Sequence, residues 1–219
     1  MLIKKLLAVC NTVAMLAIFL VVAIYLPTYS MNFYKAQYAK YNIPQNIGVS
    51  EEQLMEVTKR LTDYMRGREP DIVITAEVRG VTREFFDERD KAHMVDVKEL
   101  FDLARAAFVA ALCAVIFTWA MLRNDLPLLF CTSLWTLAGL FGGFAILAGV
   151  IAMDFDTAFV QFHHIFFDND LWILDPAVSL LINIVPQEFF VDISIRIGLI
   201  FGGLVVGYAA LLAVLKRKI

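Results

Sequence analysis

The stretch LPLLFCTSLWTLAGLFGGFAILAGVIAM, from Leu126 to Met153, decides the fold of this chain. No charged side chain interrupts it. A helix needs about 20 consecutive, predominantly apolar residues to cross the ~30 Å hydrocarbon core of a bilayer. The stretch therefore predicts a membrane-spanning helix.

Three further uncharged stretches lie on either side of this one and approach the same length. They run from Leu6 to Leu26, from Ala106 to Leu122 and from Ile197 to Leu215. The chain is 60% hydrophobic and only 19% charged, which is too apolar for a protein whose surface faces water. We predict an all-α membrane protein built as a bundle of four transmembrane helices.

The basic residues that flank the spans predict their orientation. Lys4 and Lys5 precede the first span, Arg123 lies between the second and third, and a basic tail at 216–218 follows the fourth. Short loops rich in Lys and Arg stay on the cytoplasmic side. We expect a multi-pass protein of the cytoplasmic membrane with both termini in the cytoplasm. The first span should be an uncleaved anchor, because no small-x-small cleavage pattern follows it.

This topology predicts five segments. They are residues 1–26 with the first span, an extracytoplasmic cap at 27–101, the second and third spans at 102–153, an extracytoplasmic or interfacial segment at 154–192, and the fourth span with its basic tail at 193–219. We expect a small α+β cap and a short interfacial helix. All unusual chemistry should lie on the extracytoplasmic face.

Several local patterns predict elements within the exported segments. Ser50 followed by Gln53 has the form of a capping box, and Gly67 can end the helix that it starts. The β-branched run 72–78 predicts one or two strands. Asp90 should cap a helix that continues into the second span. Asp175 followed by a proline should open a short apolar helix that lies at the membrane interface.

All three histidines of the chain, His93, His163 and His164, fall in exported segments with acidic neighbours. Histidine is the side chain best suited to exchange a proton near neutral pH, and a carboxylate can fix its tautomer. Asp96 follows His93 at i+3, and acidic residues at 168 and 170 follow the other pair. If the adjoining helices continue outward, His93 and His163 both lie roughly 13 Å above the ends of their spans.

Other functions are weighed against proton transfer. A metal-dependent lipid hydrolase could use His93, His163 and aspartates as ligands, although adjacent His163 and His164 point apart on a helix. A non-enzymatic assembly or interaction protein could bind a partner through the cap. The net charge of -3, with no basic cluster outside the membrane ends, argues against nucleic acid. The uncharged spans argue against a transporter.

Two separated motifs resemble those of one known family. They are ERDKAHMVDVK at 88–98 and FHHIFF at 162–167, followed by Asp-Leu-Trp at 170–172, Asp175-Pro176 and the segment 186–190. The chain resembles the bacterial lipoprotein intramolecular transacylases, the Lit family. The resemblance implies four helices with an exported cap, and an acyltransferase that moves an acyl chain within a diacylated lipoprotein. The acyl chain would leave the sn-2 glyceryl oxygen and join the α-amino group of the lipidated cysteine.

The resemblance also implies catalytic roles for His93 and His163, with His164 at a variable position. We expect His163 to act as the base and His93 as the acid or oxyanion donor, although these roles could be exchanged. The candidate supporting, orienting or oxyanion residues are Asp96, Lys98, Asp168 and Asp170, and the candidate substrate or lipid contacts are Trp172, Phe166 and Phe167. The partners should be diacylated lipoproteins and membrane lipid. An ester-to-amide transfer is downhill and needs no cofactor or metal.

Overall fold

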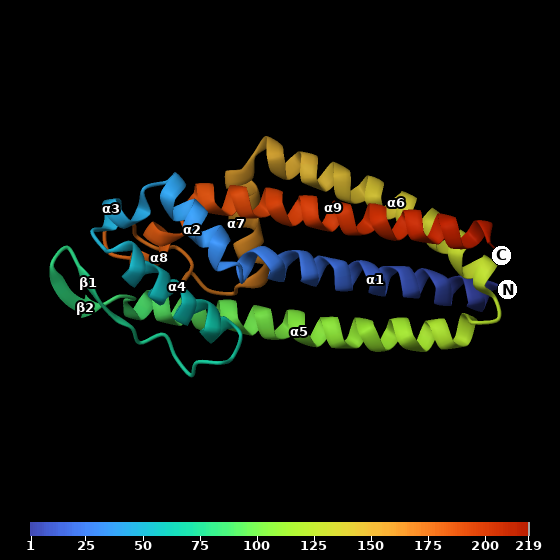
Figure 1. The fold of residues 1–219 in the computed structure, drawn as a ribbon, viewed down its shortest axis with the longest axis horizontal. Helices are drawn as coiled ribbons and strands as arrows, with labels where there is room; N and C mark the ends of the chain where they lie inside the picture. Colours follow the sequence, from blue (N-terminus) through green and yellow to red (C-terminus); the bar gives the residue numbers. More distant parts are fainter. Residues whose placement is uncertain (219) are drawn as a thin grey trace. The chain divides into compact units, whose positions relative to one another are not determined.

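The computed structural model describes residues 1–218, which form helices and one two-stranded antiparallel sheet (Figure 1). The elements follow the order α1 (Leu2–Thr28), α2 (Met31–Lys40), α3 (Ile43–Ile47), α4 (Glu51–Met65), β1 (Thr75–Val78), β2 (Val81–Glu84), α5 (Glu88–Leu122), α6 (Leu126–Met153), α7 (Phe155–Phe166), α8 (Leu180–Ile184) and α9 (Gln187–Arg217). Two compact units alternate along the chain. The apolar unit comprises Met1–Tyr25, Ala104–Ala158 and the residues from Ile195 onward, and the polar unit comprises Leu26–Leu103 and Phe159–Ser194.

The four predicted spans are confirmed. Within the described part of the chain, four helices are long and apolar enough to cross a membrane: α1, α5, α6 and α9. Large apolar side chains of the apolar unit point outward, among them Trp135, Ile146 and Leu199. An exposed apolar surface of this kind is typical of a protein that contacts lipid.

Buried side chains from all four helices form the core of the apolar unit. They are Ala8, Leu16 and Ala23 of α1, Leu122 of α5, Leu129, Phe130 and Leu137 of α6, and Phe201, Val205 and Leu212 of α9. Two buried hydrogen bonds join α1 to its neighbours. Asn11 Nδ2 donates to Thr118 Oγ1 of α5 at 2.8 Å, and Thr12 Oγ1 donates to Ser133 Oγ of α6 at 2.9 Å. Interhelical bonds between polar side chains stabilise helix pairs in lipid.

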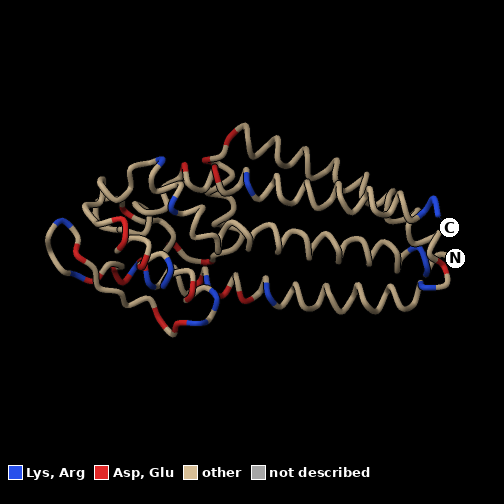
Figure 2. The backbone as a smooth tube through the Cα atoms, in the orientation of Figure 1, with Lys and Arg blue, Asp and Glu red and all other residues tan. Residues whose placement is uncertain are grey.

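The charges of the apolar unit gather at the ends of its helices (Figure 2). Basic residues lie at the end where both termini are found, and the helices between are almost free of charge. Lys4 Nζ lies 2.7 Å from Asp125 Oδ2. This ion pair holds the short α5–α6 connection beside the start of α1.

Helix α4 of the polar unit confirms the predicted helix. Ser50 Oγ accepts from the Gln53 amide at 3.2 Å, and Gly67, with φ 75°, ends the helix by donating to the Tyr64 carbonyl. Helices α2 and α4 pack together around Tyr38, whose hydroxyl is 2.7 Å from Thr58 Oγ1. The apolar face of α4, which includes the buried Leu54, Val57 and Leu61, is therefore a core face.

The sheet is a hairpin, displaced from the predicted strand at 72–78. Its turn residues, Arg79 and Gly80, both have positive φ, at 53° and 78°, as a two-residue hairpin turn requires. The Arg79 amide donates to the Gly48 carbonyl at 2.7 Å. A Cβ on Gly48 would lie 2.5 Å from Arg79 Cγ, so this contact requires glycine.

Two predicted helix starts differ in the structure, and the end of the third span agrees with its prediction. Helix α5 begins at Glu88, because the Asp87 and Asp90 side chains each accept the other's amide in a reciprocal cap, so Asp90 is inside the helix. Helix α6 ends at Met153, and α7 begins after a break at Asp154. Ser179, which accepts from the Ile182 amide, caps α8, whereas Asp175 caps only the turn before it.

Candidate functional site

The polar unit brings His93 and His163 together. His93 lies near the start of α5 and His163 near the end of α7, and their ring centroids are 6.2 Å apart. Only 8% of His93 and 7% of His163 is exposed. Histidine is usually only partly buried, so two buried, adjacent imidazoles are an unusual arrangement.

A backbone hydrogen bond fixes the tautomer of His163. Its Nδ1 lies 2.7 Å from the carbonyl oxygen of Phe159, one turn earlier in α7. A carbonyl only accepts, so Nδ1 must carry the proton, which leaves the lone pair on Nε2. Burial lowers the pKa of His163, although the bond to Phe159 partly opposes this. The neutral ring, with Nε2 able to accept a proton, is therefore the form present at neutral pH.

His93 is also neutral at neutral pH. Burial lowers the pKa of His93 to about 4, and His163 acts in the same direction, against the attraction of Asp96. The Nδ1 atom of His93 is buried and has no hydrogen-bond partner among the described residues. The Asp96 carboxylate instead accepts from Asn169 Nδ2 at 2.9 Å. Asp96 therefore affects His93 through its charge and not by a hydrogen bond to Nδ1.

Aromatic rings surround the two imidazoles. Trp172 stacks on His163 with ring centroids 4.6 Å apart and an interplanar angle of 28°. The ring centroid of Phe159 lies 4.3 Å from that of His163, and the ring centroid of Phe167 lies 5.4 Å from that of His93. These rings exclude water from the imidazoles, and electrostatic interactions are stronger in such an environment.

Arg89 holds the loop that carries Trp172. Its guanidinium donates to the carbonyl oxygen of Ile173 at 3.1 Å and to that of Asp170. Asn169, at the start of the same loop, bonds Asp96 of α5. Helix α5 therefore binds the loop on both sides of Trp172.

The other predicted residues lie in different surroundings. Lys98 Nζ bonds Asp102 at 3.0 Å and lies over the ring of Tyr64. Asp168 is exposed, and Asp170 binds Arg89 through its backbone carbonyl. Phe166 is 48% exposed and contacts Phe162. His164 is exposed, with its ring edge-on to Trp172.

Asp90 and Arg89 also support the site, although the sequence did not indicate this role for either residue. Asp90 is fully buried, and its Oδ1 accepts from Ser179 Oγ at 2.6 Å. Burial raises the pKa of Asp90, and the Ser179 bond opposes this shift. Two aspartates spaced as Asp87 and Asp90 have the capping-box form, which could have revealed the helix start. No sequence pattern indicates that Arg89 would bind the 170–173 loop.

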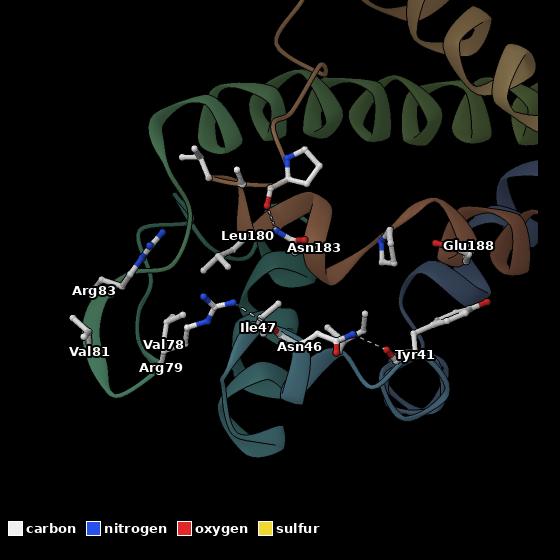
Figure 3. Close-up of a pocket in the computed structure, with 15 residues that line it drawn as sticks. Tyr41, Asn46, Ile47, Val78, Arg79, Val81, Arg83, Leu180, Asn183 and Glu188 are labelled. Carbon is white, nitrogen blue, oxygen red and sulfur yellow. Dashed lines mark hydrogen bonds between the residues drawn. The ribbon is translucent and has the colours of Figure 1, made fainter.

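A second feature of the polar unit is a cavity of about 710 Å³ (Figure 3). Tyr41, which follows α2, and residues of α3, the hairpin and the segment 176–188 line it. Arg79 and Arg83 contribute guanidinium groups from the hairpin, and Glu188 contributes a carboxylate. Neither His93 nor His163 belongs to this lining.

The potential metal ligands of the described residues do not form a site. Among residues 1–218, no three His, Cys, Asp or Glu side chains converge as a metal site requires. The geometry gives no support to the alternative of a metal-dependent hydrolase.

Comparisons with known proteins agree with the motifs. The family model for "Lipoprotein intramolecular transacylase Lit" matches residues 9–190. The fold is similar to that of the membrane integral lipoprotein intramolecular transacylase Lit from Bacillus cereus, with a TM-score of 0.78 and 20% identity over 99% of this chain and 97% of that one. Two variants of that protein, with one histidine replaced by arginine or by alanine, give TM-scores of 0.74 and 0.71 at 19% identity, over 99% of this chain and 93% of theirs.

A search of the curated proteins finds no match. The family match extends over most of the chain, which confirms the predicted membership. The likeness of the solved structures shows the shared fold. The chain belongs to the Lit family of lipoprotein intramolecular transacylases, and it is an integral membrane acyltransferase.

Proposed function

We propose that this transacylase moves the sn-2 acyl chain of a diacylglyceryl-cysteine lipoprotein to the α-amino group of the same cysteine, with His93 and His163 as catalytic residues. The observation that carries the proposal is the pair of buried, neutral imidazoles 6.2 Å apart. Perturbed pKa values of adjacent buried histidines are typical of proton-transfer sites. The product is a lyso-form lipoprotein with a free sn-2 hydroxyl.

His163 acts as the general base. Its Nδ1 is bound to the Phe159 carbonyl, so Nε2 is the atom that accepts the amine proton as the amine attacks the ester carbonyl. An α-amino group has a pKa of about 7.7 to 8.0, so a fraction of it is already neutral at physiological pH. The base therefore removes a proton only as the C–N bond forms.

His93 acts on the leaving group. Its low pKa makes a stable imidazolium unfavourable, so His93 gives its N–H proton to the glyceryl oxygen as the C–O bond breaks, while its other ring nitrogen takes the proton that His163 removed from the amine. The proton taken by His163 is returned through the pair. The net result is that one proton moves from the amine to the glyceryl oxygen, and both histidines end neutral.

The aromatic rings contribute in two ways. They exclude water, which would otherwise compete with the amine and release a free fatty acid. Phe166 and Trp172, together with Phe167, contact the lipid part of the substrate and hold the amine near the ester. An amine and an ester held in this way react at a high effective molarity.

The polar unit forms the extracytoplasmic cap in this proposal. The basic residues at the terminal end of the apolar unit support a cytoplasmic location for both termini. Residues 27–101 and 154–192 are then exported, and 1–26, 102–153 and 193–219 contain the spans. The exposed side chains of Ile173 and Val178 before α8 would meet the headgroup region, which makes this segment interfacial.

Isotope labelling tests the reaction directly. Purified protein in vesicles receives two lipopeptides together, one with a deuterated sn-2 chain and one with a heavy-isotope peptide. Mass spectrometry should find the deuterated chain on the amine of its own peptide only, and vesicles without protein give the spontaneous rate. Deuterated chains on the heavy peptide would contradict intramolecular transfer, and a chain lost from sn-1 would contradict the assigned position.

A further inference from the structure

The indole nitrogen of Trp172, Nε1, is a buried donor without a hydrogen-bond partner among the described residues. Burying an unpaired donor costs free energy, so such an atom in a native structure requires an explanation. The indole that carries Nε1 is the ring stacked on His163, which places the unpaired donor in the wall of the histidine site.

The surroundings of Trp172 hold the ring in place before substrate binds. Arg89 bonds the carbonyl groups of Asp170 and Ile173, and Leu174 donates its amide to the Trp172 carbonyl at 3.0 Å. A donor held in this way costs little reorganisation when charge develops nearby, which is the requirement for stabilising a transition state.

Three other side chains of the polar unit with N–H donors already make hydrogen bonds. Lys98 Nζ binds Asp102, Asn169 Nδ2 binds Asp96, and the Arg89 guanidinium binds two carbonyl groups. In the proposed reaction, the N–H of His93 is directed to the glyceryl oxygen. For the oxyanion that forms from the ester carbonyl, the Nε1–H of Trp172 is a buried donor that has no other partner among the described residues.

We propose that the Nε1–H of Trp172 donates a hydrogen bond to the oxyanion of the tetrahedral intermediate. This inference rests on the proposed function and assigns a further catalytic residue to it. The indole forms and breaks no covalent bond, and its proton is not transferred. The negative charge that appears on the carbonyl oxygen as the amine adds is stabilised by Nε1–H, and it disappears when the C–O bond breaks.

The test replaces Trp172 with 3-benzothienylalanine, which keeps the shape and stacking of indole but has sulfur in place of N–H. Loss of one oxyanion donor lowers kcat by about 100- to 1,000-fold. We expect a fall of about this size with an unchanged KM and melting temperature. Full kcat in this variant would overturn the proposal. A raised KM with an unchanged kcat would also overturn it, by showing only ground-state contact with the lipid.

A second measurement covers the case in which the variant loses stability. A thionoester at sn-2 has a sulfur that accepts hydrogen bonds poorly, so wild-type protein should lose much more rate on this substrate than the benzothienyl variant does. Equal losses would show that no donor on Trp172 meets the reacting atom, and would overturn the proposal. Formation of the lyso-form product by wild-type protein is read in the same assay. Its absence would contradict the proposed function itself.

Discussion

Ser179 Oγ donates a 2.6 Å hydrogen bond to the fully buried carboxylate of Asp90. Each partner also caps a helix, since Asp90 accepts the Asp87 amide at the start of α5 and Ser179 accepts the Ile182 amide at the start of α8. One contact therefore joins the two helix starts. His93 follows Asp90 by one turn, so this contact also supports the start of the histidine site.

Replacing Asp90 by alanine should destabilise the protein. The change leaves the Ser179 hydroxyl and the Asp87 amide without their buried acceptor, at a cost of about 1–3 kcal/mol for each unpaired group. The melting temperature in detergent should fall clearly. Asp168→Ala, at an exposed carboxylate, is the control and should melt like wild type. An Asp90→Ala protein as stable as wild type would contradict the role of this contact.

Acid should destabilise the polar unit through His93. The pKa of His93 is lowered from 6.5 to about 4, so the unfolded chain binds a proton that the folded protein does not accept. No stability is lost above pH 6.5, the loss grows as pH falls below 6.5, and it is complete near pH 4. At about 1.4 kcal/mol per unit, the full loss is about 3 kcal/mol.

A His93→Phe variant separates this effect from the titration of carboxylates. Phenylalanine does not titrate and suits a buried aromatic site. The fall in melting temperature between pH 7.5 and pH 4.5 should be smaller in this variant than in wild type. The same fall in both proteins would show that His93 is not held neutral by burial.

The substrate amine should control the pH dependence of the rate near neutrality. Because the pKa of His163 is lowered below its ordinary 6.5, its base form predominates at pH 7, whereas the amine loses its proton only near pH 7.7 to 8.0. The kcat/KM should rise about six- to eightfold between pH 6.5 and pH 7.5. A substrate whose amine pKa is one unit lower should move this limb by one unit. If the rising part of the pH profile of kcat/KM does not move with the amine pKa, the titrating group belongs to the protein and not to the substrate.

Arg89→Lys should lower kcat with little effect on stability. A lysine cannot bond two carbonyl groups in the geometry of a guanidinium, so the 170–173 loop that carries Trp172 would be less well held. Small displacements in an active site can cost up to about 100-fold, and we expect a fall of about 10- to 100-fold in kcat. Arg68→Lys, on an exposed arginine paired with Asp63, is the matched control. An unchanged kcat in Arg89→Lys would show that the loop does not need this contact.

The sequence predicts the membrane helices well because their signal is local. Each span is an uninterrupted apolar run, and a bilayer requires that length and composition whatever the helix packs against. The helix at 51–65 was predicted for the same kind of reason, since Ser50 acts on an amide three residues away. The candidate histidines also follow from local patterns, through their acidic neighbours and motifs.

What the sequence does not predict depends on distant contacts. The hairpin ladder begins only at Thr75, although Ile72 and Ile74 are buried, and its turn residue Arg79 binds Gly48 far along the chain. Asp96 could equally bond His93 or another partner, and the Asn169 amide decides this. The free Nε1 of Trp172 is visible only once every neighbouring donor and acceptor has been placed.

In the proposed reaction, His93 and His163 transfer the proton during acyl migration. Its most direct test is the rate of lyso-form product in vesicles, measured by mass spectrometry, for His93→Ala, His163→Ala and the matched control His164→Ala. General acid or base catalysis by a side chain contributes about 100- to 10,000-fold. We expect losses of that size in the first two variants, with normal folding, and a near wild-type rate for His164→Ala. A wild-type rate in either of the first two would contradict this proton transfer.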